Sequence, residues 1–308
     1  MSTEPGDRHP PATSQLPGAD PVAPPPAAIP AVSLPLLRTA PLQPAERALN
    51  EALYRARTGP VYLGDHTVLC RVLGRYKVFV DTRDIGLASH LMLDGYWEMW
   101  VTEVLSALVK PGMVVADIGA NLGYYALLMA DLVGPAGRVF AFEPNPRLNG
   151  LMTNSLSVNG MGHAVIHRLA LSDCAGEVML VVPPGEPKNG FIAPVADPIP
   201  ANAAVVHSVR LDANPDWAGI ELAKIDVEGS EEKIWAGMAG LLASDTLKTV
   251  VLEFTPTRYR DPRAFLQALT DPGFSLARID FDQGIVACDA EAVLSGDPLD
   301  DVMLVLRR

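Results

Sequence analysis

Two acidic residues near the middle of the chain each end a short apolar run. Asp117 follows Met113–Ala116, and Glu143 follows Val139–Phe142. Between them lie a glycine turn with the sequence GANLG, at 119–123, and a nearly all-apolar segment. Glycines before a helix let the backbone approach a ligand, and an acid at the end of the next strand can bind ribose hydroxyls. The spacing predicts a strand, a turn, a helix and a second strand around a nucleoside site.

The glycine turn distinguishes between two classes of cofactor. A dinucleotide site needs the pattern G-x-G-x-x-G, but Asn121 occupies the second glycine position and Tyr124 the third. The pattern D-x-G-A-N-x-G resembles instead the first motif of class I S-adenosylmethionine (SAM) methyltransferases. That ligand carries an adenosine without phosphate and a sulfonium cation, which favours a nearby carboxylate such as Asp117. An NAD-dependent oxidoreductase is the alternative function.

Acidic residues also end two later apolar runs. Asp226 and Glu228 follow the first of these runs, and Glu253 lies near the end of the second. The carboxyl ends of the strands in a doubly wound sheet line one ligand crevice. We therefore expect these side chains to face the same crevice as Asp117 and Glu143.

Methyl transfer to a hydroxyl group needs an in-line approach and a proton acceptor. Asp226 is the predicted general base, and Glu228 is the second candidate. In an alternative interpretation Asp226 only contacts the cofactor or caps a helix. Another alternative is a Mg²⁺ ion held by Asp226, Glu228 and Glu253, because hard cations prefer oxygen ligands.

Five motifs occur in a fixed order along the chain. They are DIGANLGYY at 117–125, FEPN at 142–145, ALSD at 170–173, LD at 211–212 and KIDVEGSE at 224–231. Together they resemble the FkbM family of SAM-dependent methyltransferases over about residues 84–256. The resemblance implies an O-methyltransferase that acts on a hydroxyl of a sugar, glycolipid or polyketide-like metabolite. The predicted cofactor-binding residues are Asp117, Gly119, Asn121, Gly123, Glu143, Asp173 and Asp226.

The pattern of apolar runs predicts an α/β fold with a doubly wound, mostly parallel, seven-stranded sheet, as in the Rossmann-like class I methyltransferases. Residues 111–308 are expected to form this SAM-binding domain, with an antiparallel hairpin at the sheet edge. Residues 45–110 are expected to form a helix, a β-meander and a lid region. Residues 1–44 contain twelve prolines, which predicts a disordered tail.

Two segments are candidates for shaping the substrate mouth. The proline-rich stretch 183–200 is too long for a plain connector. The aromatic cluster YWEMW at 96–100 is interpreted as anchoring a helix in the core. In the alternative, Tyr96 or Glu98 belongs to a lid over the cofactor.

Composition excludes several classes of protein. The formal net charge is −12 without a run of Lys or Arg, so we expect a small-molecule or glycan substrate and no nucleic acid. No apolar run is long enough for a membrane span, and the first residues lack a secretory signal. Cys70, Cys174 and Cys288 lack metal-ligand spacing and predict reduced thiols in a cytoplasmic protein. A non-catalytic SAM-binding scaffold stays open as a third function, and the oligomeric state is left undecided.

Overall fold

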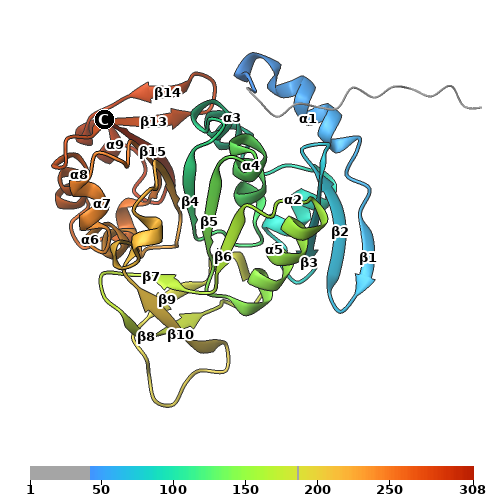
Figure 1. Cartoon of the computed structure of the whole chain (residues 1–308), viewed down its shortest axis with the longest axis horizontal. Helices are drawn as coiled ribbons and strands as arrows, with labels where there is room; N and C mark the ends of the chain where they lie inside the picture. The colour runs from blue at the N-terminus through green and yellow to red at the C-terminus, as the bar shows by residue number, and fades with distance from the viewer. Residues whose placement is uncertain (1–41, 186) are drawn as a thin grey trace, which may run out of the picture. The chain divides into compact units, whose positions relative to one another are not determined.

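The structure is a computed structural model that describes residues 42–185 and 187–308. Its main element is an eight-stranded sheet in the order β14-β13-β15-β12-β11-β4-β5-β6 (Figure 1). The central pairs are parallel, and the three strands at one edge are antiparallel. The strands are β4 (Val114–Ile118), β5 (Arg138–Phe142), β6 (Ala164–His167), β11 (Leu222–Ile225), β12 (Thr249–Phe254), β13 (Ser275–Asp280), β14 (Gly284–Ala287) and β15 (Val302–Arg307).

This topology confirms the predicted doubly wound, mostly parallel α/β fold. The chain runs from β4 outward through β5 and β6, and then returns to the other side of β4 as β11 and β12. The strand order therefore reverses beside β4, which is where such sheets bind ligands. The sheet carries β14 in addition to the seven strands predicted. Among the described strands, this short edge strand pairs with β13 alone.

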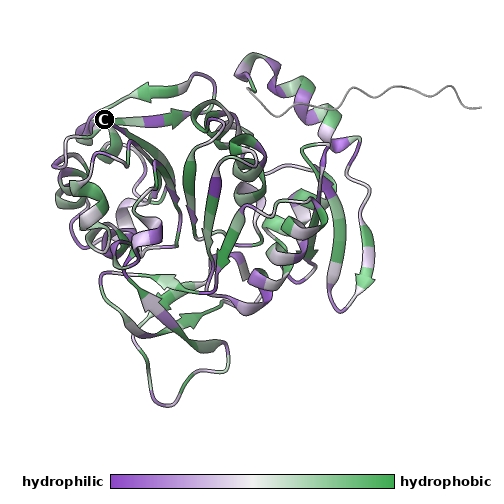
Figure 2. Cartoon of the chain, in the orientation of Figure 1, coloured by the Kyte–Doolittle hydropathy of each residue, from purple (hydrophilic) through white to green (hydrophobic). Residues whose placement is uncertain are grey.

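Helices cover both faces of the sheet. Successive strand residues point to opposite faces, so Val139 and Ala141 of β5 belong to one apolar core, whereas Phe140 and Phe142 belong to the other. Figure 2 shows the resulting apolar strands of the sheet. The first core lies under α3 (Met99–Leu108), α4 (Tyr124–Val133) and α5 (Pro146–Val158), and the second under α6 (Glu231–Ala236), α7 (Ala239–Ala243), α8 (Pro262–Thr270) and α9 (Ala290–Leu294).

Local sequence explains where two of these helices begin. Asn145 accepts a hydrogen bond from the backbone N–H of Arg147 at 3.0 Å, and Pro146 occupies the first turn of α5. Asp261 does the same for Ala264 at the start of α8. Both are favoured N-cap residues, because their side chains satisfy backbone donors that the first helical turn leaves free.

The predicted N-terminal meander is confirmed as an antiparallel sheet of three strands. Its strand β3 packs on α5, where Ser155 accepts a hydrogen bond from Phe79 N at 3.0 Å. Arg47 of α1 pairs with buried Glu103 of α3 at 2.6 Å. Of the predicted tail, residues 1–41 lie outside the described residues. The elements are η1 (Pro44–Glu46), α1 (Arg47–Arg55), β1 (Val61–Gly64), β2 (Thr67–Val72), β3 (Tyr76–Asp81) and α2 (Leu87–Leu93).

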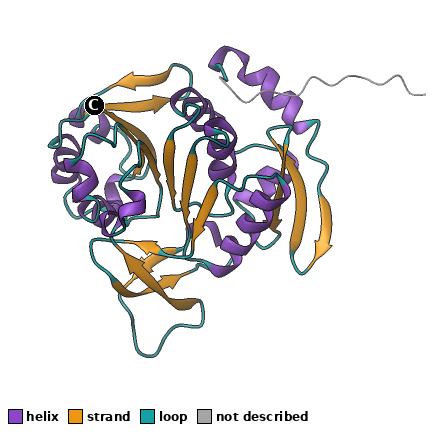
Figure 3. Cartoon of the chain, in the orientation of Figure 1, coloured by secondary structure: helices purple, strands orange, loops and turns teal. Residues whose placement is uncertain are grey.

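A second, four-stranded sheet is inserted between β6 and β11, in the order β7-β10-β8-β9 (Figure 3). The segment 164–171 is divided between the two sheets, because His167 pairs with Phe142 of the large sheet and Leu171 pairs with Val209 of the smaller one. The proline-rich stretch 183–200 contributes β9 to it. The elements are β7 (Ala170–Leu171), β8 (Gly176–Val181), η2 (Pro187–Asn189), β9 (Phe191–Ala193) and β10 (Ala203–Val209), followed by the 3₁₀ turns η3 (Leu211–Ala213) and η4 (Pro215–Trp217), with η5 (Pro256–Arg258) after β12.

None of the helices within 42–185 and 187–308 combines the length and apolar character of a membrane span. Cys70, Cys174 and Cys288 form no disulfide with one another among the described residues, and their reduced state stays a prediction. The cytoplasmic location and the domain boundaries stay predictions.

Candidate functional site

The turn after β4 and the end of β11 lie in direct contact. Gly119 adopts φ +77°, and a Cβ built on it would stand 1.8 Å from the carbonyl oxygen of Asp226. The backbone N–H groups of Gly119 and Ala120 both donate to the carbonyl of Phe142, at the end of β5. Three strand ends that are far apart in the sequence therefore meet at this turn.

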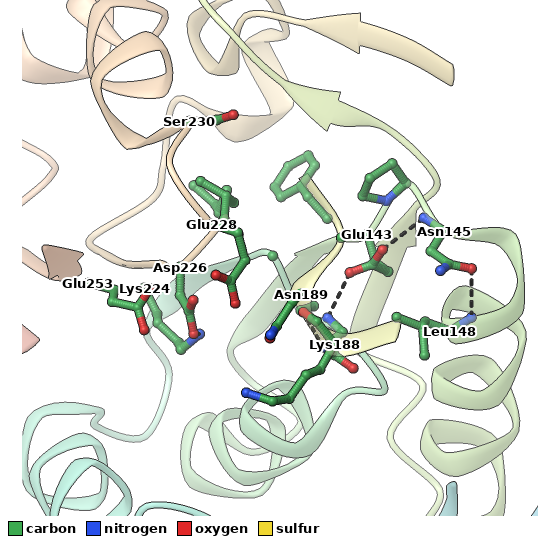
Figure 4. A pocket seen from close by; sticks show the side chains of 18 of the residues that line it. Glu143, Asn145, Leu148, Lys188, Asn189, Lys224, Asp226, Glu228, Ser230 and Glu253 are labelled. Atoms are coloured by element: carbon green, nitrogen blue, oxygen red, sulfur yellow. Dashed lines mark hydrogen bonds and ion pairs between the residues drawn. The ribbon is translucent and has the colours of Figure 1, made fainter. Parts of the chain in front are cut away.

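Glu143 forms one end of the site and is 6% exposed. Its carboxylate accepts hydrogen bonds from the backbone N–H of Asn121 at 2.9 Å and of Asn145 at 2.8 Å (Figure 4). Burial raises the pKa of Glu143 to about 7, although these two hydrogen bonds oppose the change. Each carboxylate oxygen retains a lone pair for a further donor, so the group is suited to binding hydroxyls.

Lys224 lies under the other end of the site and is 2% exposed. Its Nζ donates to Oδ2 of Asp226 at 2.9 Å and stands 4.8 Å from the centre of the Tyr125 ring. Burial alone lowers the pKa of Lys224, but the charges of Asp226 and Asp117 outweigh it and raise the pKa. The charged lysine therefore holds the Asp226 carboxylate in place.

Asp117 is fully buried beneath the site and does not line its cavity. Among the described residues neither of its carboxylate oxygens has a hydrogen-bond partner, and Lys224 Nζ lies 3.9 Å away. Burial raises the pKa of Asp117 to about 6, and the charge of Lys224 counteracts this. In the structure, Asp117 therefore interacts with Lys224. Direct contact between Asp117 and a cofactor stays a prediction.

Three carboxylates converge beside Lys224. Asp226, Glu228 and Glu253 each offer one oxygen within 4.8 Å of the others. The guanidinium of Arg258 donates to Glu228 at 2.7 Å and to Glu253 at 2.5 Å. Burial raises the pKa of Glu228 to about 7, and burial together with the neighbouring acids raises that of Glu253 to about 9. This part of the site therefore carries both exchangeable protons and a fixed cation.

A cavity of about 380 Å³ joins these groups. The helix-start residues Trp97 and Glu98 line it, and Glu98 accepts a hydrogen bond from Tyr125 at 2.8 Å. The proline-rich stretch contributes Lys188 and Asn189. Residues 96–100 and 183–200, the two segments singled out in the sequence, therefore both contribute to the cavity. The charged and amide side chains in its wall are Glu98, Asn121, Glu143, Asn145, Lys188, Asn189, Lys224, Asp226, Glu228, Glu253, Arg258 and Asp301.

The structure does not bring every predicted residue to the cavity. Gly123 lies against Met152 of α5, where a Cβ would stand 2.6 Å from Cγ, so its small size serves helix packing. Asp173 is exposed, bonds to Ser172 and does not line the cavity. For both residues cofactor binding stays a prediction, and neither has a contact that supports it.

Three functional candidates were missed in the sequence. Lys224 had a signal, because a lysine inside an apolar strand must be buried with a carboxylate partner. Arg258 and Lys188 follow no periodic pattern, since each lies in a 3₁₀ turn. Only the folded chain shows that these two side chains reach the cavity.

Known proteins match the chain in the region that builds this site. The Methyltransferase FkbM domain matches residues 117–276, just over half of the chain. The 31-O-demethyl-FK506 methyltransferase FkbM of Streptomyces tacrolimicus is 30% identical, over 42% of this chain and 61% of that protein. A protein-L-isoaspartate O-methyltransferase of Methanopyrus kandleri is 40% identical over 60 residues, which cover 20% of this chain and 26% of that protein. The matches thus span less than two thirds of these curated relatives.

Two solved structures are similar to the chain at low identity. The methyltransferase FkbM from Methylobacillus flagellatus KT is 14% identical with a TM-score of 0.40, over 65% of this chain and 45% of that one. TYW2 from P. horikoshii, in complex with MeSAdo, is 12% identical with a TM-score of 0.42, over 86% of each chain. On the domain match across residues 117–276, the chain belongs to the FkbM methyltransferase domain family.

Proposed function

We propose that this protein is a SAM-dependent O-methyltransferase that methylates a hydroxyl group of a small molecule or glycan. The observation that carries the proposal is the pair of carboxylates at the two ends of one cavity. Glu143 stands at one end with backbone N–H partners, and Asp226 stands at the other with Lys224. The names of the curated relatives, which are methyltransferases, support the same reaction class.

The residues present fit SAM. Glu143 has free lone pairs for the two ribose hydroxyls, and the tight approach of Gly119 to Asp226 brings the turn beside the predicted transfer site. The carboxylates near the cavity favour a cationic ligand over one that carries phosphates. When bound, SAM supplies the methyl group and its own leaving group, so the chain must provide orientation and proton transfer.

Asp226 is the proposed proton acceptor for the substrate hydroxyl. Its hydrogen bond to Lys224 fixes the carboxylate at the cavity wall, and one oxygen stays available for a substrate. Glu228 is the second candidate. One of its oxygens already accepts a hydrogen bond from the guanidinium of Arg258, so Glu228 is less available to a substrate hydroxyl than Asp226.

A Mg²⁺ ion at the three carboxylates is the alternative that Arg258 disfavours. The guanidinium already donates to Glu228 and Glu253, and Lys224 donates to Asp226. A divalent cation at the same oxygens would meet two fixed positive charges. We therefore propose proton transfer to Asp226 without a metal ligand in that position.

A thermal-shift panel with SAM, S-adenosylhomocysteine, NAD and NADP tests the cofactor class. A ligand present at 100 times its Kd stabilises the fold by about 2.7 kcal/mol, so we expect a rise in Tm with the first two compounds. A rise with NAD or NADP alone would overturn the proposal. Methyl transfer from labelled SAM into fractionated host extract then identifies the acceptor, and an absence of transfer despite SAM binding would favour the non-catalytic scaffold.

A further inference from the structure

Three cationic side chains of the described residues line the cavity, and they differ in their partners. Lys224 pairs with Asp226 and Asp117, and Arg258 pairs with Glu228 and Glu253. Among the residues that the structure describes, no carboxylate lies within ion-pairing distance of Lys188, although it is part of the cavity wall. Asp84, Glu98 and Glu228 interact with the charge of Lys188 only from beyond ion-pairing distance, so its N–H donors are available to a ligand.

Contacts on several sides position Lys188. Its Nζ lies 5.5 Å from the centre of the Trp97 ring, within the range of a cation–π contact. Its aliphatic part packs so closely on Gly86 that a Cβ there would stand 2.6 Å from Cε. Its carbonyl accepts a hydrogen bond from Nδ2 of Asn121 at 3.5 Å. Figure 4 shows the side chain extending along the cavity toward the side of Lys224 and Asp226.

The charge of the cavity wall restricts where an anionic group can bind. Six carboxyl groups of the described chain contribute to the wall, so an anion would be repelled at most positions. Lys224 and Arg258 already bind carboxylates. A ligand carboxylate therefore has one favourable position, next to Lys188. The six acids of the wall are Glu98, Glu143, Asp226, Glu228, Glu253 and Asp301.

We propose that Lys188 binds the carboxylate of the amino-acid part of SAM. This inference rests on the proposed function. The side-chain amide of Asn121 donates a hydrogen bond to the backbone carbonyl of Lys188. The backbone N–H of Asn121 donates to Glu143, the proposed ribose partner. The same turn therefore connects the two groups that would fix opposite ends of the cofactor. An acidic acceptor substrate is the other source of a carboxylate, and the experiment must separate the two.

The test compares SAM with decarboxylated SAM, which differs from it by the carboxylate alone. Titration calorimetry would be run on the wild type, on Lys188→Met and on Lys188→Arg. Lys248→Met is the matched control. Lys248 is exposed and lies just before the start of β12, whereas Glu253 lies near the other end of that strand. Circular dichroism would check that each variant is folded.

We expect Lys188→Met to bind SAM about 10- to 100-fold more weakly, the usual effect of losing a hydrogen bond to a charged group. Its affinity for decarboxylated SAM should stay equal or rise, because a repelling cation has been removed. Lys188→Arg should retain most of the preference for SAM, and Lys248→Met should match the wild type.

Three results would overturn the assignment. Wild-type SAM affinity in Lys188→Met would show that the carboxylate binds elsewhere, and a higher KM for an acidic acceptor in that variant would assign Lys188 to the acceptor instead. Equal losses for both ligands would show that Lys188 only shapes the cavity. If the wild type bound neither ligand, the proposed function itself would fail, and this outcome is distinct from the other three.

Discussion

The carbonyl oxygen of Asp226 lies against Gly119, at a place where a Cβ would stand 1.8 Å from it. These two residues belong to different sequence motifs, and they directly follow the neighbouring parallel strands β4 and β11. The strand order of the sheet reverses between these strands. Position 119 therefore requires a glycine for two reasons. The backbone of Asp226 leaves no room for a Cβ, and the φ of +77° disfavours other residues.

Gly119→Ala should consequently destabilise the fold by about 3 kcal/mol, because the added methyl group combines backbone strain with overpacking. Gly160→Ala separates these two causes. Gly160 has a similar φ of +72°, but no atom of the described residues lies within 4 Å of the place where its Cβ would stand, so only the strain of about 1 kcal/mol applies. Urea denaturation of both variants measures the difference. Equal losses in the two variants would show that the contact with Asp226 has no energetic effect.

The sequence was sufficient to predict that four carboxylates meet at the edge of the sheet that lines the cavity, and the reason is topological. Glu143, Asp226, Glu228 and Glu253 all end or follow parallel strands, and such ends meet at one edge of a sheet. Asp117 also ends a parallel strand, yet it points beneath the cavity toward Lys224. The register of a strand end determines this difference, and a single sequence does not reveal it.

The cationic partners could not be predicted in the same way. Arg258 reaches the cavity from the 3₁₀ turn after β12, and Lys188 reaches it from a 3₁₀ turn inside the proline-rich stretch 183–200. Their positions depend on how β12 packs and on the insertion that contains β9. Neither feature produces a periodic pattern of apolar residues in the sequence.

Substitution of Glu143 should weaken cofactor binding. Glu143→Gln keeps the shape of the side chain but replaces one acceptor by a donor, so S-adenosylhomocysteine should bind about 10- to 100-fold more weakly. Glu232→Gln is the matched control, because Glu232 is an exposed acid in the first turn of α6. Titration calorimetry on folded protein provides the measurement. Unchanged affinity in Glu143→Gln would mean that Glu143 does not bind the ribose hydroxyls.

Glu253 should make the stability of the fold depend on pH. Its pKa in the folded state is raised to about 9, whereas an unfolded glutamate titrates near ~4.3. Between these values the folded state binds the additional proton, so stability decreases as the pH rises, by at most about 1.4 kcal/mol per pH unit. Glu253→Gln lacks this proton, so its stability should decrease less steeply. Urea denaturation from pH 5 to pH 8 compares the slopes, and parallel slopes would contradict the raised pKa.

Asp226→Asn is the test of the proposed proton acceptor. The variant retains the size of the side chain and removes its charge and basicity. Turnover should fall about 10²- to 10⁴-fold with little change in SAM affinity, because general base catalysis typically contributes that factor. Asp216→Asn, at an exposed acid in η4, is the control and should keep wild-type turnover.

The accompanying measurements separate base catalysis from the other roles of Asp226. If SAM affinity fell in step with turnover, Asp226 would orient the cofactor instead of accepting the proton. If EDTA abolished wild-type activity and Mg²⁺ restored it, the three carboxylates would hold a metal despite Arg258. Lys224 loses a charged partner in the variant, so the free energy of unfolding has to be measured alongside turnover. Wild-type turnover in folded Asp226→Asn would end its assignment, and Glu228→Gln would become the next variant to assay.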